Sequence, residues 1–150
     1  MRVMTKTSRE TRALGKKMGS SLIRSGPKDM KALVVAFFGN LGAGKTTFLA
    51  GFAKGLGVKE HIVSPTFVIM KRFPLRKGFY KNFYHIDCYR LQDPRELLAL
   101  GFKKICADPH AIVAIEWSER IRNILPKDCI RVTLKAIDKN KREIRLWRKK

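Results

Sequence analysis

Three glycines and a lysine follow an apolar run near residue 39, and their spacing is that of a phosphate-binding loop. The stretch GNLGAGKTTF, residues 39–48, fits G-x4-G-K-[ST] through Gly39, Gly44, Lys45 and Thr46. In such a loop, backbone N–H groups surround a nucleotide's phosphates, the lysine reaches the terminal phosphates and the hydroxyl ligates Mg²⁺. Glycine is needed because a side chain would block this approach and because several backbone angles are left-handed.

Two acidic residues close apolar runs further along the chain. Asp87 ends FYHID, and Glu116 ends AIVAIE. Ligands of open α/β sheets bind at the carboxyl ends of strands, so we expect both carboxylates to face the loop. A charge that ends a buried strand needs a compensating partner, and Mg²⁺ would be one. A structural alternative is that Asp87 caps or pairs with Arg90. Glu116 could likewise pair with Arg120.

Thr66, in the segment SPTF, is a further candidate for nucleotide chemistry. Hydrolysis needs a carboxylate near magnesium and a group that positions water. Thr66 could meet the γ-phosphate or its metal, as switch threonines do in other phosphate-loop proteins. The alternative is that residues 64–66 form only a turn.

A strand and a helix flank the loop, as its function requires. The run ALVVAFF, residues 32–38, predicts a buried strand of the parallel type. After the loop, helical spacing is shown by the apolar residues Phe48, Leu49, Phe52 and Leu56. Gly57 then lies where a glycine that ends a helix is expected.

The rest of the chain alternates between helical and extended patterns. A first helix is expected from a cap at Ser8 or Thr11 to Gly26-Pro27, and another from Asp93-Pro94 to Gly101. Extended runs cover 62–73, 79–89 and 111–117, and a hairpin is expected from 129–137 and 142–147. The alternation predicts an α/β fold, a P-loop NTPase-like sandwich with a mainly parallel central sheet and an antiparallel C-terminal edge hairpin.

Composition predicts one globular domain, residues 1–150, in the cytoplasm. The apolar fraction of 45% is that of a folded protein, and no run approaches the roughly eighteen apolar residues of a membrane span. The first residues lack a hydrophobic signal core, although their Arg- and Thr-rich composition leaves a transit peptide open. Three cysteines without a C-x-x-C pair indicate neither a disulfide framework nor a zinc site.

The net charge of +21 favours a polyanionic partner, with nucleic acid as the first candidate. No acidic residue lies between His61 and Ile86, whereas residues 71–81 hold five basic ones and residues 141–150 hold six. Direct contact with RNA is therefore expected as one reading. The alternative is a generally basic proteome or ordinary solvated faces, since net charge supplies only a non-specific attraction.

Several short motifs occur in an order that resembles one family. They are a T-x-x-LG segment at 11–15, G-x-LGAGKTTF, SPTF, H-x-D-x-YRL, a D-P-x-E-L helix and EW-x-E. This set is similar to the TsaE (YjeE) family, the small ATPases of bacterial tRNA threonylcarbamoyladenosine synthesis. The phosphate loop is shared by many families, but its combination with SPTF, HIDCYRL and EWSER is specific.

The resemblance implies a protein that binds ATP and Mg²⁺ and acts with the TsaD and TsaB proteins, which attach the threonylcarbamoyl group. It implies metal ligation by Thr46 and Glu116 and an acid needed for activity at Asp87. Ser8 and Arg142 match positions that contact the nucleoside. The expected nucleotide-binding residues are thus Gly39, Asn40, Leu41, Gly42, Ala43, Gly44, Lys45, Thr46, Thr47, Ser8 and Arg142. The expected catalytic residues are Lys45, Thr66, Asp87 and Glu116.

Three positions depart from the family pattern, and none is an expected phosphate or metal ligand. Asn40 stands where the family commonly has Asp, Cys88 where it has Leu, and Ser118 where it has Pro. Arg90 and Arg120 are candidates for an arginine finger, but neither is clearly placed, so a slow isolated ATPase is expected.

Other function classes share some of these features. A small-molecule or nucleotide kinase would use the basic segment 71–81 as a lid over phosphates. A GTPase fits less well, because NKRE at 140–143 only approaches the guanine-reading pattern N-K-x-D. A non-catalytic RNA-binding module would account for the charge but leave the loop and the strand-end acids unexplained.

Overall fold

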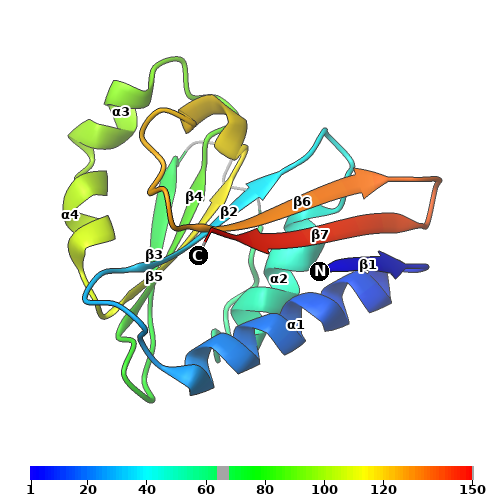
Figure 1. Ribbon diagram of the computed structural model, residues 1–150, viewed down its shortest axis with the longest axis horizontal. Helices are drawn as coiled ribbons and strands as arrows, with labels where there is room; N and C mark the ends of the chain where they lie inside the picture. Colours follow the sequence, from blue (N-terminus) through cyan, green and yellow to red (C-terminus); the bar gives the residue numbers. More distant parts are fainter. Residues whose placement is uncertain (64–67, 150) are drawn as a thin grey trace.

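Seven strands form one mixed sheet, with helices on both of its faces (Figure 1). The computed structural model describes residues 1–63 and 68–149. The strands are β1 (Arg2–Thr5), β2 (Leu33–Phe38), β3 (Met70–Pro74), β4 (Asn82–Asp87), β5 (Ala111–Glu116), β6 (Ile130–Ala136) and β7 (Arg142–Arg148). Their order is β1-β7-β6-β2-β5-β4-β3. The four central strands β6, β2, β5 and β4 are parallel, and antiparallel pairs flank them. The predicted fold class is confirmed.

The helices lie in the segments where they were expected, but some of their ends differ from the expected ones. They are α1 (Ser8–Ser25), α2 (Lys45–Gly55), α3 (Pro94–Ala99), α4 (Phe102–Ala107) and the 3-10 turn η1 (Ser118–Ile121). The N-cap of α1 is Thr7, whose hydroxyl accepts a hydrogen bond from Glu10 N at 3.1 Å. The expected cap at Ser8 or Thr11 is therefore wrong. Thr11 is buried inside the helix, where its hydroxyl bonds that of Thr5 at 2.7 Å.

Two elements were not expected from the sequence. Strand β1 pairs antiparallel with β7, with Val3 opposite Ile144, about 140 residues away along the chain. Helix α4 follows directly on α3, because Gly101 takes a left-handed φ of 87° and turns the chain into a second short helix. Helix α3 itself begins as predicted, with Asp93 as the cap and Pro94 in its first turn.

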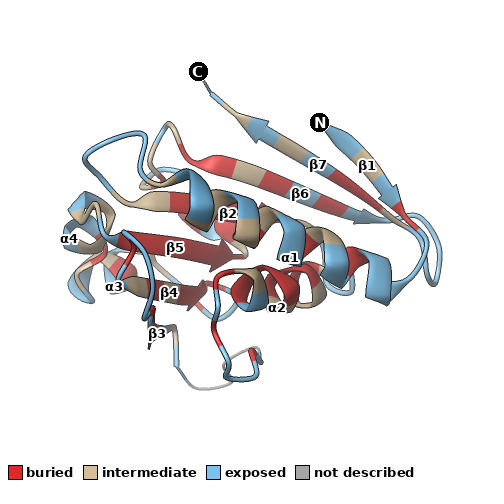
Figure 2. Cartoon of the chain, turned by 90° about the horizontal axis from the view of Figure 1, so that it is seen from below, coloured by how far each residue is buried: buried red, intermediate tan, exposed pale blue. Residues whose placement is uncertain are grey.

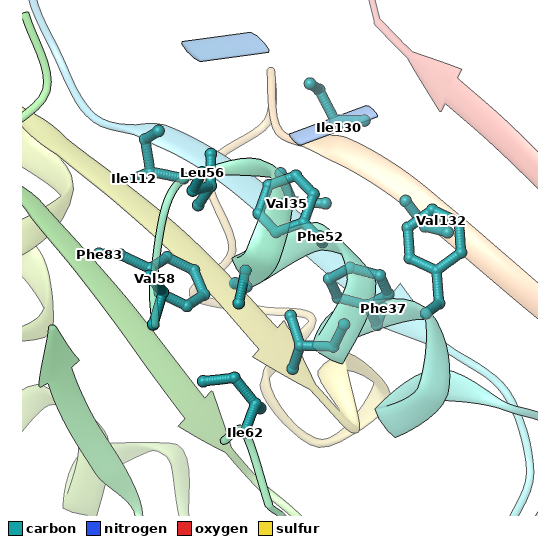
Figure 3. Close-up of a cluster of buried hydrophobic side chains, with 14 of the residues drawn as sticks. Val35, Phe37, Phe52, Leu56, Val58, Ile62, Phe83, Ile112, Ile130 and Val132 are labelled. Atoms are coloured by element: carbon teal, nitrogen blue, oxygen red, sulfur yellow. The ribbon is translucent and has the colours of Figure 1, made fainter. Parts of the chain in front are cut away.

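Strand β2 is buried on both faces, which explains its unbroken apolar sequence. On one face, Val35 and Phe37 pack with Phe52 of α2 and Phe83 of β4 (Figure 3). Its other face belongs to a second cluster, which packs beneath α3, α4 and η1. The two clusters hold β2 between the helical layers, so the loop that follows it starts from a rigid point.

Helices α1 and α2 lie side by side over the same face of the sheet, and their backbones nearly touch (Figure 2). Gly15 and Gly19 of α1 face the backbone of Phe48 and Phe52 in α2. Gly51 and Gly55 of α2 face the backbone of Arg12 and Lys16 in α1. A Cβ atom at Gly15 would lie 2.1 Å from the carbonyl oxygen of Phe48, and one at Gly51 would lie 1.9 Å from that of Arg12. Only glycine permits this contact, which fixes α2 and the loop before it.

Cysteine chemistry contributes nothing to the fold or to a reactive site. Cys88, Cys106 and Cys129 are free thiols, as expected from their number. Burial raises the pKa of Cys88 and of Cys106 to about 12, so both stay protonated. Within residues 1–63 and 68–149, no helix is both long and apolar enough to cross a bilayer.

Candidate active site

Residues 39–44 carry the chain from β2 into α2 in the geometry that a phosphate loop requires. Gly39, Gly42 and Gly44 have φ values of 146°, 79° and 97°. A Cβ atom at Gly39 would lie 2.4 Å from the carbonyl oxygen of Leu134 in β6. Helix α2 begins at Lys45, so its unpaired first-turn N–H groups face the space above the loop. The predicted left-handed angles are confirmed here, whereas the approach of phosphates to the loop backbone stays a prediction.

A cavity of about 690 Å³ opens beside this loop. Residues 41–47 form one wall, and Arg142 borders them. Asp87 and Glu116 form a second wall at the carboxyl ends of β4 and β5. These two acids are direct partners in the parallel register. The sequence predicted that both would face the loop, but not that their strands would be neighbours. None of residues 71–81 lines the cavity, and β3 holds residues 70–74 at the sheet edge.

Glu116 is held by two hydrogen bonds. The Thr46 hydroxyl donates to its Oε1 at 2.8 Å, and His85 Nε2 lies 2.8 Å from its Oε2. Glu116 and His85 are each only 2% exposed. The carboxylate is therefore fixed in position by a buried partner, and that partner is His85 and not Arg120. His85 belongs to the HIDCYRL segment, but the sequence did not indicate its role.

The oxygen atoms of Thr46 and Glu116 suit a magnesium ion. A hydroxyl and a carboxylate oxygen 2.8 Å apart at the cavity wall are hard ligands of the kind Mg²⁺ prefers. The described residues contain no group of three His, Cys, Asp or Glu side chains that could hold a metal by themselves. Mg²⁺ in nucleotide sites takes few protein ligands and completes its shell with phosphate and water.

Asp87 is 8% exposed and lines the same cavity. Its Oδ1 accepts a hydrogen bond from Tyr89 N at 2.9 Å, in a local turn that orients the carboxylate. Tyr89 and Arg90 follow it along the cavity wall. Asp87 thus lies where an acid could contact water beside bound phosphates.

Lys45 is held between the loop and an aromatic ring. Its ammonium donates hydrogen bonds to the carbonyl oxygens of Gly39 and Asn40, the latter at 2.9 Å. It also lies 3.9 Å from the centroid of the Trp117 ring. Burial lowers the pKa of Lys45, while the charges of Glu119, Glu116 and Asp87 act in the opposite direction.

Trp117 and Glu119 are site residues that sequence reasoning missed. Trp117 has a left-handed φ of 57°, which is unusual for a bulky residue, and its ring lies 4.9 Å from that of Tyr89. Glu119 Oε1 accepts a hydrogen bond from Gly39 N at 2.8 Å, which ties η1 to the first residue of the loop. Both lie in the EW-x-E motif, which was the available signal.

The remaining predicted residues differ in their placement. The side chain of Arg142 passes beside Gly44 and donates to the carbonyl oxygen of Asp138 at 2.8 Å, at the cavity edge. Ser8 is exposed at the start of α1 and does not line the cavity. Thr66 lies outside the described residues. The nucleoside contacts of Arg142 and Ser8 and the role of Thr66 stay predictions.

The three departures from the family pattern leave the cavity's polar groups in place. Cys88 is fully buried in the second core cluster, as an apolar residue would be. The Ser118 hydroxyl donates to the Ile115 carbonyl oxygen at 2.9 Å. Asn40 contributes its backbone oxygen, which any residue type supplies, to the Lys45 ammonium.

Comparisons with known proteins agree with this arrangement. Residues 5–144 match the family model of the threonylcarbamoyl adenosine biosynthesis protein TsaE. The chain is 33% identical to the tRNA threonylcarbamoyladenosine biosynthesis protein TsaE of Treponema pallidum, over 96% of this chain and 98% of that protein. It is 36% identical to the TsaE protein of Haemophilus influenzae, over 83% of this chain and 75% of that protein.

A solved structure is similar to this chain in both fold and sequence. The crystal structure of YdiB from Bacillus subtilis superposes with a TM-score of 0.69 and 30% identity, covering 96% of this chain and 82% of that one. The family model and the two relatives span the phosphate loop, both strand-end acids and the EW-x-E segment. The chain belongs to the TsaE family of tRNA threonylcarbamoyladenosine biosynthesis proteins.

Proposed function

We propose that this chain is a Mg²⁺-dependent ATPase of the cytoplasm that acts with TsaD and TsaB proteins in threonylcarbamoylation of the tRNA adenosine next to the anticodon. The observation that carries the proposal is the hydroxyl–carboxylate pair of Thr46 and Glu116 at the end of the phosphate loop. A loop that only bound a nucleotide would not need a buried, rigidly held carboxylate beside that hydroxyl.

In this mechanism the N–H groups of residues 42–47 bind the phosphates. Lys45 exchanges its carbonyl partners at Gly39 and Asn40 for the terminal phosphates and neutralises the charge that develops there. Thr46 and Glu116 would hold a Mg²⁺ ion, which would supply positive charge to neutralise the phosphates. Asp87 orients the attacking water. Positioning and charge neutralisation supply most of the rate. A partner aligns any arginine finger, and of the two candidates, Arg90 and Arg120, it is Arg90 that lines the cavity.

The test is ATP hydrolysis by the purified chain in Mg²⁺ and in EDTA, alone and with matching TsaB and TsaD. We expect slow hydrolysis that requires Mg²⁺ and rises when both partners are added. If the partners leave the rate of ATP hydrolysis unchanged and the rate depends instead on a small acceptor molecule, the chain is a kinase and this proposal is wrong.

Lys45→Ala is expected to abolish ATP binding. The ammonium is the one cation within the loop itself, and it already lies against the backbone that would cradle the phosphates. The measurement is titration calorimetry with ATP and Mg²⁺. The matched control is Lys54→Ala, which removes an exposed lysine from the last turn of α2 and should bind like the unaltered chain. Equal affinity of the two variants would remove Lys45 from the nucleotide site.

His85→Ala is expected to lower turnover about 10- to 100-fold and to leave ATP affinity nearly unchanged, because His85 orients Glu116 without facing the cavity. His85→Gln, which can donate to the same carboxylate oxygen, should recover part of the loss. The readouts are kcat, KM and the Mg²⁺ concentration for half-maximal rate, which should rise in His85→Ala. If both variants lose stability alike and keep the Mg²⁺ requirement unchanged, His85 serves only the core.

A further inference from the structure

Among residues 1–63 and 68–149, no helix packs on one sheet face over strands β1, β6 and β7. Helices α1 and α2 pack on one face of β6 and β7 through Val132, Leu134 and Ile144. On the opposite face, the second core cluster joins β2, β4 and β5 to α3, α4 and η1 and contains no residue of β1, β6 or β7 among the described ones. Figure 1 shows α3 and α4 at the far end of the sheet from β1 and β7.

The charged side chains on this uncovered face are mainly cationic. Because strand residues alternate between faces, the neighbours of the buried apolar positions point outward. The outward residues are Arg2, Met4, Arg131, Thr133, Lys135, Glu143, Arg145 and Trp147. We call the four cations and the tryptophan, Arg2, Arg131, Lys135, Arg145 and Trp147, the open basic face. The acid among the outward residues, Glu143, is already bonded by Arg2 Nε at 2.9 Å and Arg145 Nε at 2.7 Å.

Flat groups lie among these charges. Trp147 is 54% exposed, and its ring centroid is 5.6 Å from the Arg131 guanidinium. The same guanidinium lies 5.7 Å from the ring of Phe38, and its Nε is buried, without a hydrogen-bond partner in the described structure. The register places Trp147 directly opposite Arg131. An exposed aromatic ring beside a guanidinium offers a stacking position among cations.

We propose that the open basic face binds a single-stranded segment of RNA. The cations would neutralise phosphates, and the exposed Trp147 ring would stack with an unpaired base, as aromatic rings do on other sheet surfaces that bind single strands. A protein partner is the alternative occupant, because Trp and Arg are also frequent at protein interfaces. RNA is favoured because the face carries four cations against one acid, which suits a polyanion. The family's tRNA chemistry makes RNA the relevant polyanion. RNA binding here does not require ATP hydrolysis, so either proposal can fail alone.

The test is fluorescence anisotropy of a labelled 12-nucleotide single-stranded RNA of mixed sequence over a series of salt concentrations. Trp147→Ala should weaken binding about 5- to 100-fold, the effect of losing one stacked base. The pair Lys135→Gln with Arg145→Gln should lower the slope of log affinity against log salt by about 1.4, since each phosphate contact to a single strand contributes about 0.7. The matched control removes two exposed charges from α1 by Lys16→Gln with Lys17→Gln and should keep the slope.

A second readout separates stacking from charge alone. The chain has two tryptophans, so Trp117→Phe leaves Trp147 as the single reporter. We expect the RNA to quench its fluorescence and heparin, which carries charge without bases, to leave it unchanged. The proposal is overturned if RNA affinity falls equally in the α1 control and in the face variants, or if it is unchanged in Trp147→Ala. Either result would mean that RNA adsorbs through net charge alone. The proposal is also overturned if Trp147→Ala impairs only assembly with TsaB and TsaD. ATP hydrolysis without RNA should be the same in Trp147→Ala as in the unaltered chain.

Discussion

Glu116→Gln is expected to lower ATP turnover about 10²- to 10³-fold while nucleotide binding is retained. The substitution keeps the size of the side chain and its reach to Thr46 and His85, so the fold should survive. It removes the negative charge that would hold Mg²⁺ beside the Thr46 hydroxyl, and with it the charge neutralisation on which phosphoryl transfer depends. Binding should persist because the loop N–H groups and Lys45 stay in place.

The measurements are single-turnover hydrolysis and calorimetry with ATP, each over a range of Mg²⁺ concentrations. Glu96→Gln, an exposed carboxylate in the first turn of α3, is the matched control and should behave as the unaltered chain. Thermal unfolding of both variants checks that the fold is intact. Normal hydrolysis by Glu116→Gln would show that this carboxylate does not hold the metal.

Gly51→Ala is expected to destabilise the fold by about 3 kcal/mol and to lower Tm by roughly 6 to 12 °C. The added Cβ would lie 1.9 Å from the Arg12 carbonyl oxygen and 2.8 Å from its carbonyl carbon, and both are backbone atoms. No rotamer change relieves such a contact, so α1 and α2 must move apart and lose packing along their length. The gain of about 1 kcal/mol from alanine's helix propensity offsets only part of this cost.

Gly57→Ala is the control for this variant, because it makes the same chemical change where a Cβ meets nothing within 4 Å. Its φ of 91° is left-handed, so about 1 kcal/mol of backbone strain is expected from the conformation alone. The measurement is urea unfolding of both variants, with equal m-values as a check on two-state behaviour. A Gly51→Ala chain as stable as Gly57→Ala would mean that the helices do not approach this closely in solution.

The sequence by itself determined the parts of this protein that depend on neighbouring residues. The spacing of Gly39, Gly44 and Lys45 was enough to predict the loop, because loop conformation and the start of α2 are local properties. The apolar runs predicted the parallel strands, and the rule that ligands bind at carboxyl ends placed Asp87 and Glu116 at one cavity. Local cap chemistry likewise predicted the start of α3 at Asp93.

Only the tertiary structure decided which distant groups meet. His85 reaches Glu116 because β4 and β5 are neighbours in register, and Glu119 reaches Gly39 across 80 residues of chain. The pairing of β1 with β7 and the glycine contact between α1 and α2 are equally non-local. Such contacts depend on strand order and on the packing of whole elements, which a local pattern of residues does not encode. The loop was therefore predictable from its own residues, whereas the groups that hold its carboxylate and its lysine in place became visible only in the folded chain.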